Sequence, residues 1–415
     1  MNKTTIIEPM KRLTSSSGFK SFTASLVSIF IGLLIGFLIM LFSSFSISGA
    51  EPFMGLAYLF AGPFTAYDIP NDFGNMIFYT VPLIFTSLSV AVAYKTGLFN
   101  IGAPGQFLMG TMMALLIALN INSTGNAVQG VFVWILAIIC AAVAGLVWGL
   151  IPGCLKAFFG INEVIVSIMS NWIAANLFTW VFSSDAMSHL VNTGAGKSGY
   201  LITTTVTGNS TPDWGLGSLT NNSYLDIGIF IAIIIAVLCW LLLNKTTIGY
   251  SMKACGANKF SAKYAGINDK FNIMLAMAIA GALAGLGGAF YYLHAGIEIQ
   301  FKSVYQILPD YGFSGIAGAF LANCNPIACI FSALFIRYIN ASGTNLVSVG
   351  YNRYFADIII AVIIYLAGFT TFFQNVIWRL FKKKKIKKAV ETPPIEKGGP
   401  DKMPEDIDVK KEENK

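Results

Sequence analysis

Long apolar runs recur along the chain and are separated by short polar segments. Nine of these runs are about twenty residues long or longer, which is enough for a helix to cross the roughly 30 Å hydrocarbon core of a bilayer. They cover residues 22–47, 73–94, 104–121, 128–151, 163–183, 223–244, 271–293, 326–345 and 355–378. The pattern predicts an all-α polytopic membrane protein.

Basic residues near both ends of the chain predict that both termini are cytoplasmic, which requires an even number of crossings. Four basic residues precede the first run, and seven lie between Arg379 and Lys388. The missing crossing is assigned to the Gly-rich stretch 311–321, which is apolar but short and is followed by Asn325-Pro326. The sequence therefore predicts about ten transmembrane helices, with a short eighth one.

This topology distributes the remaining basic residues unevenly. Lys95, Lys156, Lys245, Lys253, Lys259, Lys263 and Lys270 fall on the cytoplasmic side, whereas Lys197, Lys302 and Arg353 fall outside. This excess of basic residues on the cytoplasmic side agrees with the positive-inside rule for membrane proteins. We expect a cytoplasmic segment 1–21, a membrane domain 22–378 with an inner loop 245–270 and an outer loop 184–222, and a disordered cytoplasmic tail 379–415.

Composition agrees with a membrane-embedded body. Hydrophobic residues make up 55% of the chain, charged residues 11%, and the mean hydropathy is +0.67; roughly a quarter of a soluble domain is charged. The net charge of +7 does not indicate nucleic-acid binding, because the basic residues lie at the ends of apolar runs. The six cysteines lack a C-x-x-C spacing, and no nucleophile–base pair lies at membrane depth, so we predict no metal, cofactor or catalytic site.

Polar residues within the runs are candidates for a solute path, because polar groups are costly in lipid. The candidates are Asn100, Gln106, Asn171, Asn325 and Arg337. The Gly- and Pro-containing stretches 95–106 and 312–326 indicate equally a permeation path or close helix packing. For Arg337, an ion pair with Asp310 or Asp357, or a position nearer the membrane surface, is an equal alternative to a path role.

Two stripes of small residues predict helices in close contact. Gly145 and Gly149 lie four residues apart in one run, and Gly281 and Gly285 lie four apart in another. Such spacing lets helix backbones approach closely in membranes. We interpret both stripes as packing surfaces.

Two polar segments at the inner ends of runs carry further candidates. Asn162 can cap the helix that Glu163 opens, where a carboxylate suits the positive helix end; an inner gate or subunit contact is the alternative. In the inner loop, helical spacing places Phe260, Tyr264 and Ile267 on one face, with Lys259 and Lys263 beside it. That helix would lie at the membrane interface or dock into a groove on a cytoplasmic partner.

Four of these stretches together resemble the permeases of ABC importers, in the branch of the branched-chain amino acid and ribose type that handles simple sugars and nucleosides. They are 96–106, 162–171, 256–267 and 312–326. Pro104 stands where the family usually has an acidic residue, and Ser167 where it commonly has Thr. The resemblance implies a half-transporter that moves a neutral polar solute inward, a nucleoside first and a simple sugar next, by alternating access.

The resemblance also implies partners. They are a cytoplasmic ATP-binding subunit, a second and different permease, and an extracytoplasmic solute-binding protein or lipoprotein. The residues implied in contact with the ATP-binding subunit are Gly256, Asn258, Lys259, Phe260, Ala262, Lys263, Tyr264 and Gly266. A secondary transporter driven by an ion gradient is the alternative, although Glu163, Asp226 and Asp357 lie near span ends rather than at the membrane centre, where coupling carboxylates are expected.

Overall fold

The computed structural model describes residues 17–47, 49–65, 68–194, 196–301, 308–369 and 372. In this part of the chain, eight helices are long and apolar enough to cross a membrane. They are α2 (Ser17–Ser44), α4 (Ile69–Lys95), α5 (Ala103–Asn120), α6 (Ala127–Phe159), α7 (Glu163–Phe182), α10 (Gly228–Lys245), α13 (Asp269–Tyr292) and α15 (Pro326–Leu346). The predicted all-α membrane architecture is confirmed.

The two other expected crossings are shorter. Helix α14 (Asp310–Leu321) has 12 residues, which is about 18 Å at 1.5 Å per residue and little more than half of a bilayer core. It is a half-helix, so the expected eighth crossing is not a complete span. Helix α16 (Tyr354–Ala367) has 14 residues, and most of the remainder of the expected span 355–378 lies outside the described residues, as do the tail 379–415 and Lys302.

Several short elements connect these helices. They are α3 (Pro52–Ala61), η1 (Gly62–Thr65), η2 (Asp185–Leu190), β1 (Val191–Asn192), β2 (Tyr200–Leu201), α8 (Thr204–Thr207), α9 (Leu216–Leu219), α11 (Thr247–Ala257), α12 (Lys259–Tyr264) and η3 (Val347–Val349). Helix α3 was not expected from the sequence, because its ten residues are too few for a span. The expected span 223–244 also begins too early, since residues 223–227 belong to the outer loop.

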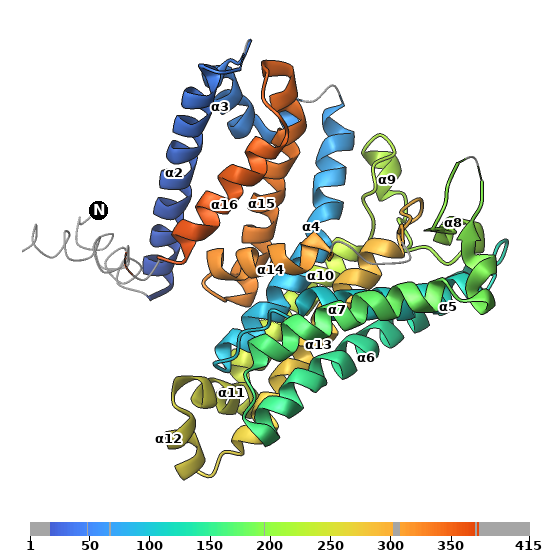
Figure 1. Cartoon of the computed structure of the whole chain (residues 1–415), viewed down its shortest axis with the longest axis vertical. Helices are drawn as coiled ribbons and strands as arrows, with labels where there is room; N and C mark the ends of the chain where they lie inside the picture. The colour runs from blue at the N-terminus through green and yellow to red at the C-terminus, as the bar shows by residue number, and fades with distance from the viewer. Residues whose placement is uncertain are drawn as a thin grey trace, which may run out of the picture.

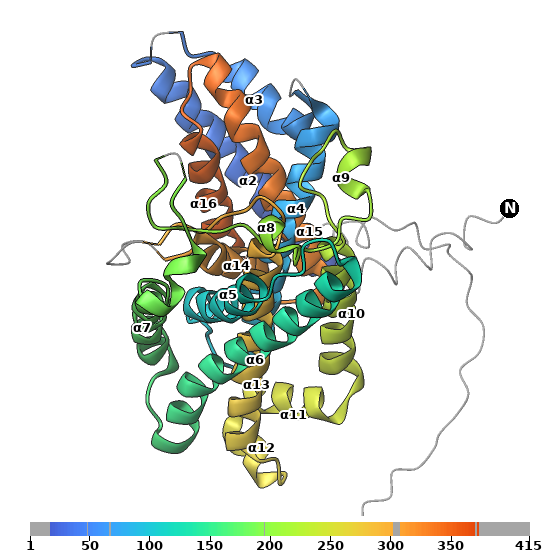
Figure 2. The same ribbon diagram turned by 90° about the vertical axis from the view of Figure 1, so that its right-hand side faces the viewer.

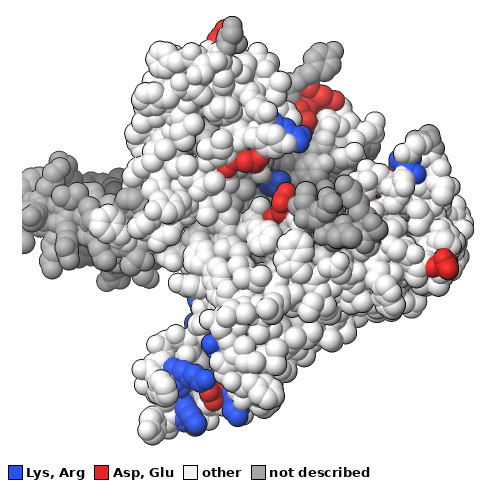
Figure 3. Space-filling view, viewed as in Figure 1, with Lys and Arg blue, Asp and Glu red and all other residues white. Residues whose placement is uncertain are grey.

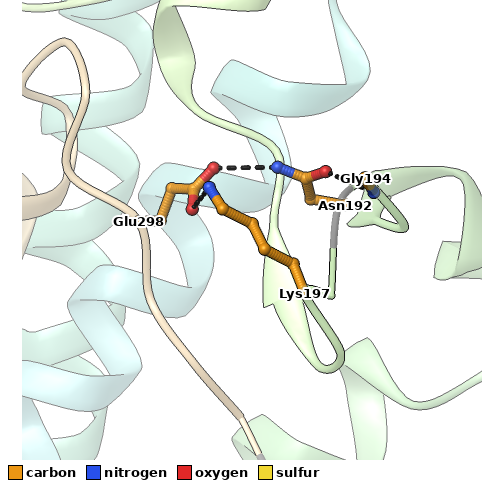
Figure 4. A network of polar contacts seen from close by, with 4 residues as sticks. All are labelled: Asn192, Gly194, Lys197 and Glu298. Carbon is orange, nitrogen blue, oxygen red and sulfur yellow. Dashed lines mark hydrogen bonds and ion pairs between the residues drawn. The ribbon is translucent and has the colours of Figure 1, made fainter.

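The outer loop is held to the segment that follows α13. Strands β1 and β2 pair antiparallel, with Val191 opposite Leu201. At the tip of this hairpin, Lys197 forms an ion pair with Glu298, whose other carboxylate oxygen accepts a hydrogen bond from Asn192 at 3.0 Å (Figure 4). These contacts fix the hairpin against the segment that follows α13.

Helix α4 forms the centre of the fold. Most of it is buried, and α10, α13, α14 and α15 all pack on it. Around it, α2, α3, α15 and α16 form one group, and α5, α6, α7 and α13 run diagonally in a second (Figures 1 and 2). Helices α11 and α12 lie at the lower end of the molecule, away from α8 and α9.

Both glycine stripes are packing surfaces, as predicted, and they pack against each other, which was not predicted. Gly145 and Gly149 of α6 face Gly281 and Gly285 of α13, and a Cβ atom on any of the four would lie closer than 3.0 Å to the backbone of the other helix. The backbones of α6 and α13 are therefore in direct contact, which only glycine permits at these positions.

Candidate functional site

The segment between α4 and α5 turns back into the protein. Asn100 in this segment donates a hydrogen bond to the Ser89 hydroxyl at 2.9 Å. Ser89 lies six residues before Lys95, the last residue of α4, which is about 9 Å along the helix. Residues 96–102 therefore run back along α4, and α5 begins below the surface rather than at it.

An amide network holds this re-entrant segment. Asn100 exchanges hydrogen bonds with Gln106, through Asn100 Nδ2 to Gln106 Oε1 at 2.8 Å and Gln106 Nε2 to Asn100 Oδ1 at 3.2 Å. Asn171 of α7 accepts a bond from the Gly105 N–H at 2.9 Å and donates to the Ile101 carbonyl at 2.9 Å. All three amide side chains are buried. They satisfy backbone groups of an irregular segment that lipid could not satisfy.

Asn171→Leu is expected to lower the stability of the protein by about 2–4 kcal/mol, because the Gly105 N–H and the Ile101 carbonyl would each lose a buried partner. Thermal unfolding in detergent measures the loss. The matched control is Asn176→Leu on the same helix, since Asn176 is exposed and its amide bonds only to the Trp172 carbonyl one turn away. Equal unfolding temperatures for the two variants would contradict a structural role for Asn171.

The two Gly-rich stretches meet where their helices begin. A Cβ atom on Gly312 of α14 would lie 2.5 Å from the Cα of Pro104, in the first turn of α5. Further along α14, Gly315 and Gly318 lie against the side chains of Thr86 and Ser87 on α4. Close packing, one of the two readings of these stretches, is thus present, and their role in permeation stays a prediction.

Arg337 of α15 lies beside a group of aromatic rings near the start of α14. Its guanidinium carbon is 4.5 Å from the centroid of the Tyr311 ring, a cation–π distance. Tyr311 contacts the Tyr291 ring with centroids 4.8 Å apart and stacks on Phe107 with centroids 6.0 Å apart. Tyr79 also packs on Tyr291, at 6.2 Å. We call Tyr79, Tyr291, Tyr311 and Arg337 the aromatic–arginine cluster.

Within the described residues, no carboxylate lies within ion-pair distance of Arg337. The ion pairs of the described residues are Lys156–Glu163, Lys197–Glu298 and Lys259–Asp269, so the alternative of a pair with Asp310 or Asp357 is not formed. Arg337 Nε is buried and has no hydrogen-bond partner within the described part of the chain. The guanidinium therefore retains unused donor capacity.

An exposed carboxylate lies at the start of α14, beside this cluster. Helix α14 ends near Lys95, whose Nζ is 3.4 Å from the Asn323 carbonyl. Asp310, the first residue of α14, is exposed. It lies eleven residues before Leu321, the last residue of this helix, and therefore up to about 16 Å from the end that is near Lys95. A few charged side chains surround a hollow near the centre of the face shown in Figure 3. Because a carboxylate facing hydrocarbon is costly, the face that bears Asp310 meets water or another polypeptide.

The tyrosines of the cluster were not among the predicted site residues. A tyrosine in an apolar run can nevertheless indicate a polar site, since its hydroxyl requires a hydrogen-bond partner. Two asparagines cap helices at the lower end, of which Asn162 was predicted as a cap and Asn325 only as a path residue. Asn325 is exposed at the lower end of the bundle and caps α15 through the Ile327 N–H at 3.0 Å, and Asn162 caps α7 through the Val164 N–H at 2.9 Å. Their roles in a path or gate stay predictions.

Glu163 joins two helices. Its carboxylate lies 2.8 Å from the Lys156 ammonium, near the end of α6, and the Glu163 side chain is only 11% exposed. The short turn between α6 and α7 is therefore fixed by an ion pair as well as by the Asn162 cap. Lys156 was not singled out beforehand, because only the fold brings it to Glu163.

Helix α12 projects from the lower end of the molecule, where lysines gather over α11 and α12 (Figure 3). Asn258 caps it by accepting from the Phe260 and Ser261 N–H groups, both at 3.0 Å. Phe260 and Tyr264 are 76% and 94% exposed. The expected apolar face is thus present but shorter than predicted, because α12 ends at Tyr264 and Ile267 lies beyond it.

The base of α12 is held by an inward-facing small residue and an ion pair. Ala262 is buried, and Lys259 pairs with Asp269 at the start of α13 at 3.1 Å. Lys263 is exposed, and Gly266 follows the helix with φ +79°, a backbone conformation that favours glycine. One side of α12 is therefore held against the rest of the protein, and the side that bears Phe260 and Tyr264 is exposed.

The end of α11 contacts the re-entrant segment directly. A Cβ atom on Gly256 would lie 2.5 Å from the Lys95 carbonyl oxygen and 2.9 Å from the Gly97 nitrogen. Helix α12, which follows Gly256 by three residues, is thus connected through backbone contacts to the segment that carries Asn100. Close contacts thus run from α12 through Gly256 to the segment that leads into α5.

Comparisons with known proteins place the chain in a family. The model of the branched-chain amino acid transport system permease component matches residues 73–368. The chain is 34% identical to the guanosine ABC transporter permease protein NupP of Bacillus subtilis, over 86% of this chain and 96% of that one. It is 35% identical to the nucleoside ABC transporter permease protein NupB of Lactococcus lactis, over 82% and 88%.

A further relative is the glucose ABC transporter permease protein TsgB13 of Haloferax volcanii, 27% identical over 78% of this chain and 84% of that one. No solved structure matches. These relatives are transport subunits rather than enzymes, and their family works with ATP-hydrolysing and solute-binding partners. The chain therefore belongs to the branched-chain amino acid transport system permease family and is a multi-pass membrane permease subunit of the ABC importer type.

Proposed function

We propose that the chain is the nucleoside-translocating half of a heteromeric ABC importer. The observation that carries this proposal is the similarity to guanosine and nucleoside permeases over more than four fifths of the chain. A simple sugar is the next candidate, because a glucose permease is also similar, though less so. The proposed companion is a different permease chain, packed against the polar face that bears Asp310.

The proposed orientation places both termini and α11–α12 in the cytoplasm. Support comes from the helix ends: α4, α6 and α10 end at or near Lys95, Lys156 and Lys245, on the side that carries α12. Cytoplasmic ends of membrane helices are enriched in lysine and arginine. The outer loop, held by the Lys197–Glu298 pair, then faces the solute-binding partner.

The aromatic–arginine cluster suits a nucleoside in transit. Tyrosine rings offer faces for a base to stack on, an interaction worth about 1–3 kcal/mol per base. The unpartnered Arg337 Nε can donate to a base carbonyl or a ribose hydroxyl without requiring a charged solute, once the cluster rearranges to expose it. We propose Arg337 as the path residue that is accessible from the polar face, and Asn100, Gln106, Asn171 and Asn325 as path contacts in a conformation in which the re-entrant segment has moved.

The backbone contacts supply a coupling mechanism. When the ATP-binding subunits close, α12 would move with them and push on residues 95–97 through Gly256. The re-entrant segment would carry this motion to the first turn of α5, where Pro104 contacts Gly312 of α14. Because Tyr311 precedes Gly312, the same motion would rearrange the aromatic–arginine cluster. Glu163 and its Lys156 partner would form the inner gate where α6 ends and α7 begins.

The test is uptake of labelled guanosine by proteoliposomes that contain the chain, its companion permease, the ATP-binding subunit and the receptor. We expect uptake that requires ATP and is inhibited by other nucleosides but not by pentoses or hexoses. Uptake by the chain alone, driven by a proton or sodium gradient, would instead indicate the secondary-transporter alternative and overturn the proposal.

Arg337→Gln is expected to reduce guanosine uptake at least fivefold while the ATP-binding subunit remains associated, because the substitution removes a charged donor from the proposed path. Arg353→Gln is the matched control, since Arg353 is exposed at the outer end of α16 and lies over Tyr354 rather than in the cluster. Normal uptake by the Arg337 variant would remove this residue from the path.

A further inference from the structure

A cavity of about 560 Å³ opens at the same end of the bundle as α11. It lies between α2, the ends of α4 and α10, helix α11 and the turn that joins α14 to α15. It is separate from the aromatic–arginine cluster, none of whose members lines it. Asn325 is the one proposed path contact that lines it, and Lys95 is the one residue of the proposed coupling contact that does.

The polar wall of the cavity is positively charged. Lys95 and Lys253 both line it and are both half-buried. Their ammonium groups contact only neutral oxygens, the Asn323 carbonyl at 3.4 Å and the Asn244 side-chain oxygen at 3.2 Å. No Asp or Glu is among the lining residues. Two partly desolvated charges therefore face one cavity without an anionic partner in the described part of the chain.

The opposite wall is apolar and reaches into the membrane. Leu26 of α2 and Phe331 of α15 line it and are 47% and 68% exposed. Phe331 lies five residues beyond the start of α15 and Phe335 four residues further, so this wall extends from about 7 to 14 Å along the helix. The lysines lie at helix ends, the level of lipid headgroups, whereas these side chains lie at the level of acyl chains.

We propose that the cavity binds an anionic phospholipid, with the phosphate between Lys95 and Lys253 and an acyl chain along Leu26 and Phe331. Basic pockets between membrane helices are suited to anionic headgroups. A free phosphate or a soluble nucleotide would satisfy the lysines but leave the apolar wall exposed. The lipid would also bridge α11 to the end of α4, and so stabilise the contact between Gly256 and the re-entrant segment.

The test measures lipid binding by the full-length chain purified in detergent. Native mass spectrometry and thermal unfolding are followed during titration with phosphatidylglycerol, phosphatidylcholine or inorganic phosphate. We expect roughly thirtyfold stronger retention of phosphatidylglycerol than of phosphatidylcholine, since two lysines near an anionic headgroup contribute about 1 kcal/mol each and each 1.4 kcal/mol is a factor of about ten. We also expect a rise in unfolding temperature with phosphatidylglycerol alone.

The double variant Lys95→Gln, Lys253→Gln should lose this preference, and Lys95→Arg, Lys253→Arg should keep it. Lys245→Gln, Lys270→Gln is the matched control, because these lysines lie at the same end of the molecule but do not line the cavity. Equal retention of the two lipids by the unmodified chain would overturn the proposal. So would equal losses in the Gln variant and the control, or stabilisation by inorganic phosphate as strong as by the lipid.

Discussion

Replacing Gly281 by leucine should prevent α13 from packing on α6 and leave little folded protein in the membrane. A Cβ atom at this position would lie 2.1 Å from the Gly145 carbonyl oxygen and 3.0 Å from the Gly149 Cα. Both neighbours are backbone atoms, so no rotamer change can make room for it. The two helices would have to separate, and membrane helices depend on such close packing because lipid offers no hydrophobic drive to bring them together.

The smaller substitution Gly281→Ala is expected to destabilise the same contact to a lesser degree. One methyl group at a backbone contact should lower stability by about 3 kcal/mol, the upper end of the usual overpacking cost. The measurements are the yield of monodisperse protein and its unfolding temperature in detergent. Gly153→Ala is the control on the same interface, since its Cβ would lie 3.0 Å from the Met277 Cβ and 3.3 Å from the Met274 Cα, a looser fit than the 2.1 Å at Gly281. If both alanine variants matched the unmodified protein, direct backbone contact between α6 and α13 would be wrong.

The long helices could be predicted from the sequence because burial in lipid leaves one unambiguous signal, an apolar run of sufficient length. The errors lie where length fails as a criterion. Helix α3 is too short for a span, α14 is a half-helix, and α10 begins five residues later than its apolar run. In each case the boundary is set by tertiary contacts, which hydropathy does not register.

The candidate site could be predicted only as a set of residues. Asn100, Gln106 and Asn171 were recognisable because amides in lipid need partners. Their mutual bonds were not, since Asn171 lies 66 residues from Gly105 in the chain. The tyrosines around Arg337 were missed because aromatic residues in an apolar run look like core packing. The glycines of the Gly256–Gly97 contact were noted, but no local pattern shows that two distant glycines touch.

Removing the aromatic side chains of α12 should uncouple ATP hydrolysis from transport. Phe260 and Tyr264 are 76% and 94% exposed on a helix whose other side is fixed by Ala262 and by the Lys259–Asp269 pair. Aromatic side chains that fill a partner's pocket often cost 2 kcal/mol or more when truncated. The double variant Phe260→Ala, Tyr264→Ala should therefore reduce ATP-driven uptake more than tenfold, while its unfolding temperature remains unchanged because neither side chain supports the fold.

Two measurements distinguish docking of α12 on the ATP-binding subunit from a helix that only lies on the membrane surface. They are co-purification of the ATP-binding subunit and guanosine uptake in proteoliposomes. Tyr250→Ala provides the control, because Tyr250 is 69% exposed on the adjacent helix α11 but lies outside α12. Docking into a partner predicts that subunit retention and uptake fall together in the α12 variant and persist in the control. If α12 only rests on the bilayer surface, the ATP-binding subunit should be fully retained by the α12 variant and by the Tyr250 control. That outcome would contradict docking through α12, and another contact would have to transmit the force to Gly256 and the re-entrant segment.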